Sequence, residues 1–412
     1  MDLLLTIICF LFAIIEYKNT NKVHNPLTLF LGTWALVFCL YTLNPYNLPS
    51  ITASTYYIYI VGFVSFLFGY LLVPNNKRLY KNKTREVNNF RFRVFIIIML
   101  IFMVIPALKS LSLLLSGVDL YDIRYVHHDD IMGNGIVSIA FVYFCEPFIT
   151  FLIVYSVVNM FIGKNKIQYL CLSIISLALM TVITGGRFFV LYFMASLLIA
   201  LFVYSSSPVA KKIIKYSVLL LGVMILLLVI ISLIRGSDIV RTIYVYLSGC
   251  IPFMEGRLSE NYNLHHTFGL ASLYGFIRPV FVVLRAFFSI PLPLPLQVVE
   301  SVFLEDDAMY MLTREISYNS FVSIFYCMYL DGGLVGVAIG NIVLGILSKK
   351  IYLKLREDDM YSIILFTLIG IVFLLSFFKL LICNYSYALS FVYLMFCFNL
   401  KKTLSKYGGI KN

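Results

Sequence analysis

Apolar residues in this chain form long continuous runs, separated by short segments that hold most of the charged residues. Runs of about 17–25 apolar residues are long enough for a helix to cross a bilayer. Their continuity argues against barrel strands, in which apolar and polar residues alternate. The pattern predicts eleven transmembrane helices, over residues 2–16, 26–43, 52–73, 94–116, 135–161, 167–184, 187–205, 213–234, 331–348, 360–378 and 384–400.

The composition also indicates a membrane protein. Of the 412 residues, 61% are hydrophobic and only 13% are charged, and the mean hydropathy is +0.93. The first run, residues 3–15, lacks the basic start and the small-residue cleavage site of a signal peptide, and further runs follow at once. We therefore expect an all-α polytopic membrane protein that retains its first run as a transmembrane helix.

Basic residues in the short loops predict the orientation, because cytoplasmic loops are enriched in lysine and arginine. Residues 77–93 carry seven basic side chains, and the loops that alternate with this one hold most of the other lysines. This distribution places the N-terminus outside and the C-terminus in the cytoplasm. The formal net charge of +12 then reflects topology, and we expect no nucleic-acid partner.

The two kinds of basic residue are distributed differently across the predicted membrane. Of the 19 lysines, 17 fall on the cytoplasmic side, with Lys109 and Lys379 as the exceptions, whereas eight of the 13 arginines fall outside. Arginine has a planar fork that binds phosphate or carboxylate through two hydrogen bonds. The outer face is therefore predicted to bind an anionic ligand, and ion pairing with the 14 outer acids is the alternative.

Residues 235–330 form the longest predicted connection and divide the chain into 1–234, this external loop and 331–412. A loop of this length is more often functional than idle. Its apolar stretch 267–290 would invert every later loop if it crossed the membrane. We therefore expect a helix that lies in the outer interface.

Two arginines support this interpretation of the external loop. Arg278 and Arg285 are seven residues apart and would share one face of the interfacial helix, although Pro279 predicts a kink between them. Residues 314–333 have a similar pattern, and Asp331 is predicted to be the N-cap of the next span.

The stretch VITGGRFFVLYF, residues 182–193, places an arginine in an otherwise apolar run. It lies at a predicted outer turn, and the next span begins near Arg187, so the positive end of that helix faces outward. Gly185 and Gly186 permit close backbone approach, and the free amides of a helix N-terminus bind anions. We expect a ligand site here; the alternative is a tight turn whose arginine reaches lipid phosphates.

Candidates for a general base lie in the external loop. FMEGRLSENYNLHH, residues 253–266, brings Glu255, His265 and His266 together beside an arginine. Imidazole suits this role because its unperturbed pKa is close to neutral. The alternative is that these are ordinary polar side chains of a solvated loop.

Two further stretches contain residue types that bind ligands. RYVHHDDI, residues 124–131, combines histidines with aspartates, but adjacent histidines point to different helical faces, and we predict no metal. Glu146 lies inside a predicted span. An acid at that depth is either a buried hydrogen-bonding group or part of a groove for lipid.

Five segments, spread along nearly the whole chain, resemble the O-antigen and capsule repeat-unit polymerases, the Wzy-type membrane glycosyltransferases of bacteria. They are NPLTLFLGTWAL (25–36), TASTYYIYIVGFVSFLFGYLL (52–72), TGGR (184–187), HHTFGLASLYGFIRP (265–279) and YLDGGLVGVAIGNIVLGIL (329–347). One departure is the acidic stretch LEDDAMYMLTREISYNSF (304–321), where the family is threonine-rich.

The resemblance implies polymerisation of polyprenyl-diphosphate-linked oligosaccharides at the outer side of the bacterial cytoplasmic membrane. The growing glycan would move from its lipid diphosphate to the non-reducing end of a new repeat. His266, His265 or Glu255 would act as the base, and Glu146 would line the groove for the lipid. The diphosphate would be bound by Arg187, Arg278, Arg285, Arg257, Arg314, Gly185 and Gly186.

The same resemblance implies no cofactor and no metal. The partners would be the lipid-linked oligosaccharides, membrane lipids, a chain-length regulator and a flippase. Two other classes remain open from the sequence. One is a flippase or exporter of the same lipid-linked sugars, and the other is an O-antigen ligase or a membrane acyltransferase.

Overall fold

Helices account for most of the regular structure in the computed structural model, as the long apolar runs predict. The structure describes residues 1–75, 85–118, 136–163, 166–184, 186–205, 211–234, 238–260, 266–307, 310–318 and 322–400. Within these residues, seven helices are long and apolar enough to cross a membrane. The chain is therefore an all-α polytopic membrane protein.

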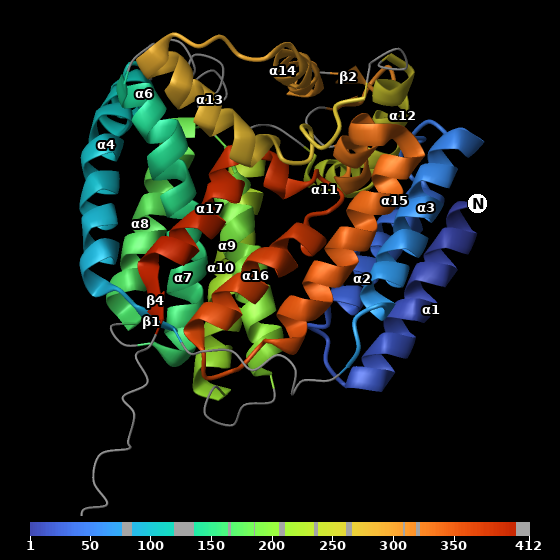
Figure 1. Ribbon diagram of the computed structural model, residues 1–412, viewed down its shortest axis with the longest axis horizontal. Helices are drawn as coiled ribbons and strands as arrows, with labels where there is room; N and C mark the ends of the chain where they lie inside the picture. Colours follow the sequence, from blue (N-terminus) through green and yellow to red (C-terminus); the bar gives the residue numbers. More distant parts are fainter. Residues whose placement is uncertain are drawn as a thin grey trace, which may run out of the picture.

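The bundle is built from long and shorter apolar helices (Figure 1). The long ones are α1 (Asp2–Thr20), α2 (Pro26–Leu43), α3 (Ala53–Leu71), α4 (Asn89–Leu115), α8 (Lys166–Thr184) and α15 (Ile324–Leu353), together with the continuous helix formed by α6 (Ile136–Ala140), the π-helical turn η3 (Phe141–Cys145) and α7 (Glu146–Ile162). The bundle also contains α9 (Phe188–Tyr204), α10 (Lys211–Ile234), α16 (Met360–Leu374) and α17 (Tyr385–Cys397).

Short polar side chains mark where several of these helices begin. Asn25 accepts a hydrogen bond from the amide of Leu27 at the start of α2 (2.9 Å). Asn88 accepts one from the amide of Arg91 at the start of α4 (3.1 Å). Such a cap satisfies an amide that has no partner within the helix. The polar segments between apolar runs therefore carry local signals for the helix ends.

Glycines allow α3 and α15 to pack with their backbones in contact. A Cβ atom at Gly69 would lie 2.2 Å from the carbonyl oxygen of Ile342, and one at Gly345 would lie 2.4 Å from that of Phe66. In a membrane, lipid is as apolar as the side chains, so close packing at small residues drives helix association. These two glycines make the α3–α15 contact possible.

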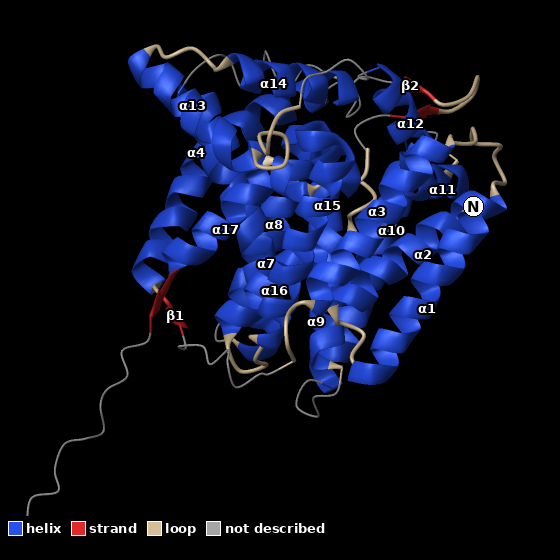
Figure 2. Cartoon of the chain, turned by 45° about the vertical axis from the view of Figure 1, so that its right-hand side comes forward, coloured by secondary structure: helices blue, strands red, loops and turns tan. Residues whose placement is uncertain are grey.

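The described parts of residues 238–318 lie over one end of the bundle, and we call them the cover layer (Figure 1). Figure 2 shows α13 and α14 crossing this end in a second view. The cover layer contains α11 (Ile239–Ser248), α12 (Cys250–Glu260), α13 (Tyr274–Phe288), α14 (Leu294–Asp307) and the hairpin of β2 (Tyr310–Met311) with β3 (Ser317–Tyr318).

One face of α13 is apolar and exposed. Val280, Val283 and Phe287 follow one another at helical spacing, and together with Phe288 they remain exposed. The side that carries Tyr274 and Gly275 is buried. The helix therefore has the amphipathic character of a segment that lies along a membrane interface.

The end of the bundle opposite the cover layer contains a short antiparallel pair, β1 (Arg85–Val87) with β4 (Phe398–Leu400) (Figure 1). The prediction of a helix over 384–400 is wrong at its C-terminal end, because α17 stops at Cys397. The chain continues as a strand there because residues 85–87, distant in sequence, supply its hydrogen-bonding partner.

The span predicted from residue 331 corresponds to the second part of α15, which consists of two helical segments that meet at a kink. Its helical geometry is interrupted at Gly332 and Gly333, and Gly333 adopts φ +58° and ψ −143°. This conformation is readily accessible only to glycine. The glycine pair therefore separates a first helical segment, which begins at Ile324, from the segment that the sequence predicts as a span.

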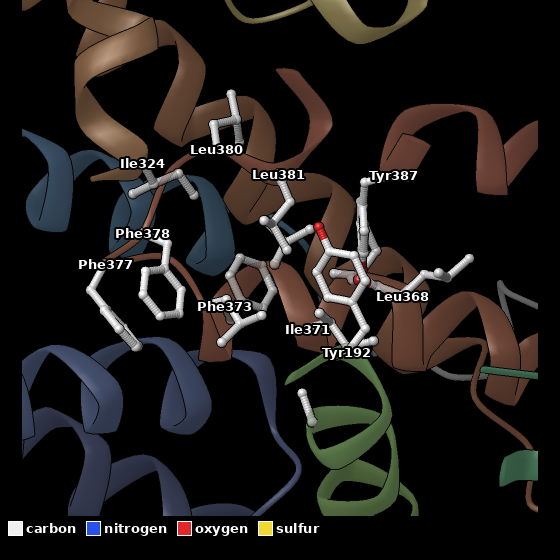
Figure 3. Close-up of a cluster of buried hydrophobic side chains, with 14 of the residues drawn as sticks. Tyr192, Ile324, Leu368, Ile371, Phe373, Phe377, Phe378, Leu380, Leu381 and Tyr387 are labelled. Carbon is white, nitrogen blue, oxygen red and sulfur yellow. The ribbon is translucent and has the colours of Figure 1, made fainter. Parts of the chain in front are cut away.

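Residues 375–384 join α16 to α17 inside the protein, and we call them the buried turn. The sequence predicts a span to residue 378, but α16 ends at Leu374 with 15 residues, and α17 has 13. Each is shorter than the roughly 20 residues that usually cross a bilayer. Phe377, Phe378, Leu380 and Leu381 of the turn are buried (Figure 3). Irregular backbone at such depth is tolerated where protein surrounds it.

Candidate functional site

The buried turn is in direct contact with both the bundle and the cover layer. The amide of Ser323, which precedes α15, donates to the carbonyl oxygen of Phe378 (3.0 Å). A Cβ atom at Gly275 in α13 would lie 2.3 Å from the carbonyl oxygen of Ile382. Only glycine allows α13 to lie this close to the turn. Several of the residues that the sequence suggests for function meet at this junction.

Arg278 of α13 is surrounded by aromatic rings and one carboxylate. Its Nε donates to Oε1 of Glu300 in α14 (3.1 Å), Nη2 donates to the same oxygen, and Nη1 donates to the hydroxyl of Tyr143. The guanidinium lies 5.7–5.8 Å from the ring centroids of Tyr143, Tyr274 and Tyr385. Burial raises the pKa of Tyr274 although Arg278 opposes this, so that phenol stays neutral. An arginine in such a cage is fixed in position and keeps its charge.

Glu146 lies near this cage, at the start of α7 and directly after the π-helical turn. It is half-buried, and Tyr143, Tyr192 and Tyr385 lie near it from three different segments of the bundle. Among the described residues, its carboxylate has no hydrogen-bond partner. π-Helical turns are frequent at functional sites, and acids inside a bundle are functional candidates by default.

Asp331 anchors the cover layer to α15. Its Oδ1 accepts hydrogen bonds from the hydroxyl of Thr267 (2.6 Å) and the amide of Ala271 (3.0 Å), and its Oδ2 accepts one from the amide of Ser272 (3.0 Å). The carboxylate therefore caps the turn that leads into α13. The sequence predicts instead that Asp331 caps the next span. That prediction is wrong, because the groups that donate to its carboxylate are far away along the chain.

His266 immediately precedes this capped turn and is exposed. Its Cε1 lies 3.5 Å from the position that a Cβ atom on Gly333 would occupy, at the break in α15. The imidazole also makes an edge contact with Phe268, with ring centroids 6.5 Å apart. A solvent-accessible imidazole in a defined position beside a helix break can accept a proton from a bound hydroxyl.

Two further cations lie beside the buried turn. Arg187 is at the N-cap position of α9, after Gly186, and the adjacent Phe188 ring lies 5.9 Å from that of Phe378. Lys379 follows Phe378 in the turn and is half-buried. Lys379 is therefore part of the turn, the residue after Arg187 contacts the turn, and Arg278 faces Tyr385, the residue that directly follows the turn.

Glu255, a predicted base, has a structural contact instead of an open carboxylate. Its Oε2 accepts hydrogen bonds from the amide (3.2 Å) and hydroxyl (3.1 Å) of Thr52 and from the hydroxyl of Thr55. Thr52 is the N-cap residue of α3. The carboxylate therefore stabilises the positive end of this helix and joins α12 to the bundle.

Arg257 is likewise engaged within the cover layer. It is only 6% exposed, and its Nη1 donates to Oε2 of Glu260 (2.7 Å) while Nη2 donates to the carbonyl oxygen of Glu305. The guanidinium also lies over the rings of Phe253 and Tyr310. Arg257 therefore follows the alternative to ligand binding, in which an outer arginine pairs with an acid of the protein itself. Its contacts hold α12, α14 and the β2–β3 hairpin together.

The remaining candidates do not meet at the buried turn within the described part of the chain. Arg285 is exposed in the last turn of α13, and Arg314 is exposed between β2 and β3. His265 and Gly185, and the histidine-containing stretch 124–131, lie outside the described residues.

Four residues of the junction have no assigned role in the sequence interpretation: Tyr143, Tyr385, Glu300 and Lys379. Lys379 has a visible signal, since it is one of only two lysines on the predicted outer side. Tyr143 lies three residues before Glu146, one helical turn away. Glu300 and Tyr385 have no such signal, because only the fold brings them to Arg278.

The fold and this junction define a polytopic helical membrane protein with a cationic site beneath an amphipathic cover. Comparisons of the chain with protein families, with curated proteins and with solved structures find no match.

Proposed function

We propose that this protein polymerises polyprenyl-diphosphate-linked oligosaccharide repeats at the outer side of the bacterial cytoplasmic membrane. One observation carries the proposal: α13, which carries Arg278, packs on the buried turn that contains Lys379, and Phe188, the residue after Arg187, contacts Phe378 of the same turn. Preorganised cations suit a diphosphate leaving group, and an exposed imidazole suits a base. The exposed apolar face of α13 suits contact with the lipid of the donor.

The proposed reaction is a single displacement between two lipid-linked glycans. A hydroxyl oxygen at the non-reducing end of the new repeat forms a bond to the anomeric carbon of the growing glycan. The bond from that carbon to the diphosphate oxygen breaks, and its electron pair leaves with the lipid diphosphate. Arg278 and Arg187 stabilise this charge, and His266 takes the hydroxyl proton. The step needs no oxidant, reductant or other co-reactant.

The proposal includes a topology of eleven spans, with the N-terminus and the cover layer outside and the C-terminus in the cytoplasm. The basic loop near β1 is then cytoplasmic, as expected from its charge. Reporter fusions after Lys83 and Lys350 should report the cytoplasm, and a fusion near Glu260 should report the exterior. An exterior signal at Lys350 would contradict this topology.

A second candidate, a flippase for the same lipid-linked sugars, is favoured by one observation. The short helices α16 and α17 with the buried turn between them resemble discontinuous helices, which form substrate sites in many transporters. A transporter would also need cations that bind a diphosphate. An experiment on the glycans that cells produce is therefore required to distinguish the polymerase from the flippase.

The decisive experiment is the glycan pattern of a strain from which the gene is deleted. A polymerase predicts surface glycans of one repeat, a flippase predicts none, and a ligase predicts long chains that remain unattached to their acceptor. Complementation with the wild type and with Arg278→Lys then tests the site. Lysine keeps the charge but loses the planar fork, so we expect shorter chains at normal protein level. Full-length glycan chains from the Arg278→Lys strain would exclude a role for the planar guanidinium of Arg278.

A further inference from the structure

We infer that Glu300 is an internal competitor for the anionic ligand of Arg278: it occupies the guanidinium while the site is empty and is displaced when a diphosphate binds. The inference rests on the proposed diphosphate function and adds a regulatory element to it. It starts from the ion pair between α13 and α14, in which the Arg278 and Glu300 side chains are only 23% and 25% exposed.

The geometry of the ion pair would allow a phosphate group to bind Arg278 more strongly than Glu300 does. Both Nε and Nη2 of Arg278 donate to one oxygen, Oε1 of Glu300. A phosphate group that presents two oxygens to the same edge would form two parallel hydrogen bonds, and this bidentate arrangement is the stronger one. The diphosphate would therefore replace a shared acceptor by two separate acceptors.

Arg278 remains in place without Glu300, because its other contacts are independent of α14. Nη1 donates to the hydroxyl of Tyr143, and the rings of Tyr274 and Tyr385 face the guanidinium. These groups are neutral and do not compete for an anion. Removal of the carboxylate should consequently leave a positioned guanidinium with an open edge.

There is also a physical reason for a carboxylate to lie beside Arg278 in the empty site. A guanidinium that is mostly buried is unfavourable without a counter-charge, so the empty site is more stable with Glu300 in place. The same carboxylate weakens the binding of the diphosphate and so favours its release after transfer. Glu300 would then set the balance between capture of the donor and release of the product.

The test measures binding of inorganic pyrophosphate to the purified full-length protein in detergent. Glu300→Gln keeps the shape of the side chain and removes its charge, and we expect roughly tenfold tighter binding, the scale of a close charge pair of partial exposure. Glu300→Asp keeps the charge but shortens the side chain, and should also bind more tightly. Glu305→Gln is the matched control, since its exposed side chain lies on the same helix.

Each result has a defined meaning. Tighter binding in Glu300→Gln and Glu300→Asp that disappears when Arg278→Lys is added supports the inference. Arg278-dependent binding that Glu300→Gln leaves unchanged, or that Glu305→Gln tightens equally, overturns the inference but not the diphosphate function. Absence of any Arg278-dependent binding overturns both. Size-exclusion profiles and thermal unfolding show whether each variant is folded.

Discussion

Replacement of Asp331 by alanine should detach the turn beside His266 from α15. Asp331 is 9% exposed and accepts hydrogen bonds from Thr267 (2.6 Å), Ala271 (3.0 Å) and Ser272 (3.0 Å). A buried donor left without a partner costs about 1–3 kcal/mol. Allowing for relaxation of the turn, we expect the free energy of unfolding to fall by roughly 3–5 kcal/mol.

The variant Asp331→Asn should have an intermediate effect. Its amide keeps one oxygen as an acceptor but places an N–H group against one of the former donors, so we expect a loss of roughly 2 kcal/mol. Asp358→Asn is the matched control, because it makes the same chemical change in an ion pair with Arg356 whose aspartate side chain is 71% exposed. An exposed pair contributes at most about 1 kcal/mol.

The assay is thermal unfolding of the purified variants in detergent at one heating rate, since membrane proteins often unfold irreversibly and the apparent Tm then depends on the rate. Glycan transfer is measured in parallel, and it should fall with Asp331→Ala because His266 loses its position. An Asp331→Ala protein as stable as Asp358→Asn would refute the reasoning that this carboxylate anchors the cover layer.

Three further predictions concern the junction and its surroundings. His266→Ala should retain binding of lipid-linked substrate but lower transfer by about 10²–10⁴-fold; near-normal turnover in nanodiscs would exclude it as the base. Gly275→Ala should lower the free energy of unfolding by about 1–3 kcal/mol because the new Cβ atom meets backbone. Gly222→Ala is the control, since a Cβ atom there has open space, and it should be neutral or stabilising. Equal Tm shifts in the two variants would contradict the close packing at Gly275. Glu255→Gln should lower stability by about 1 kcal/mol through the α3 cap and leave the transfer rate per folded molecule unchanged; a slower rate at normal stability would restore Glu255 as a candidate base.

The sequence by itself determined the class of protein and the approximate positions of the helices in the bundle. Length and hydrophobicity of a run are local properties, and a bilayer selects for them directly. Helix starts such as those at Asn25 and Asn88 are local as well, because the cap and its amide partner are two or three residues apart. The amphipathic pattern around Arg278 likewise indicated a helix that does not belong to the bundle core.

Only the tertiary structure decided which of the polar residues act together. Glu300 meets Arg278, Asp331 meets the turn before α13, and Glu255 meets α3 across separations of 22 to 203 residues. No local pattern encodes such pairs, since a carboxylate accepts any donor that the fold brings to it. The same holds for the buried turn: its residues are as apolar as a span, and their irregular backbone is stable only because surrounding helices and α13 bury it.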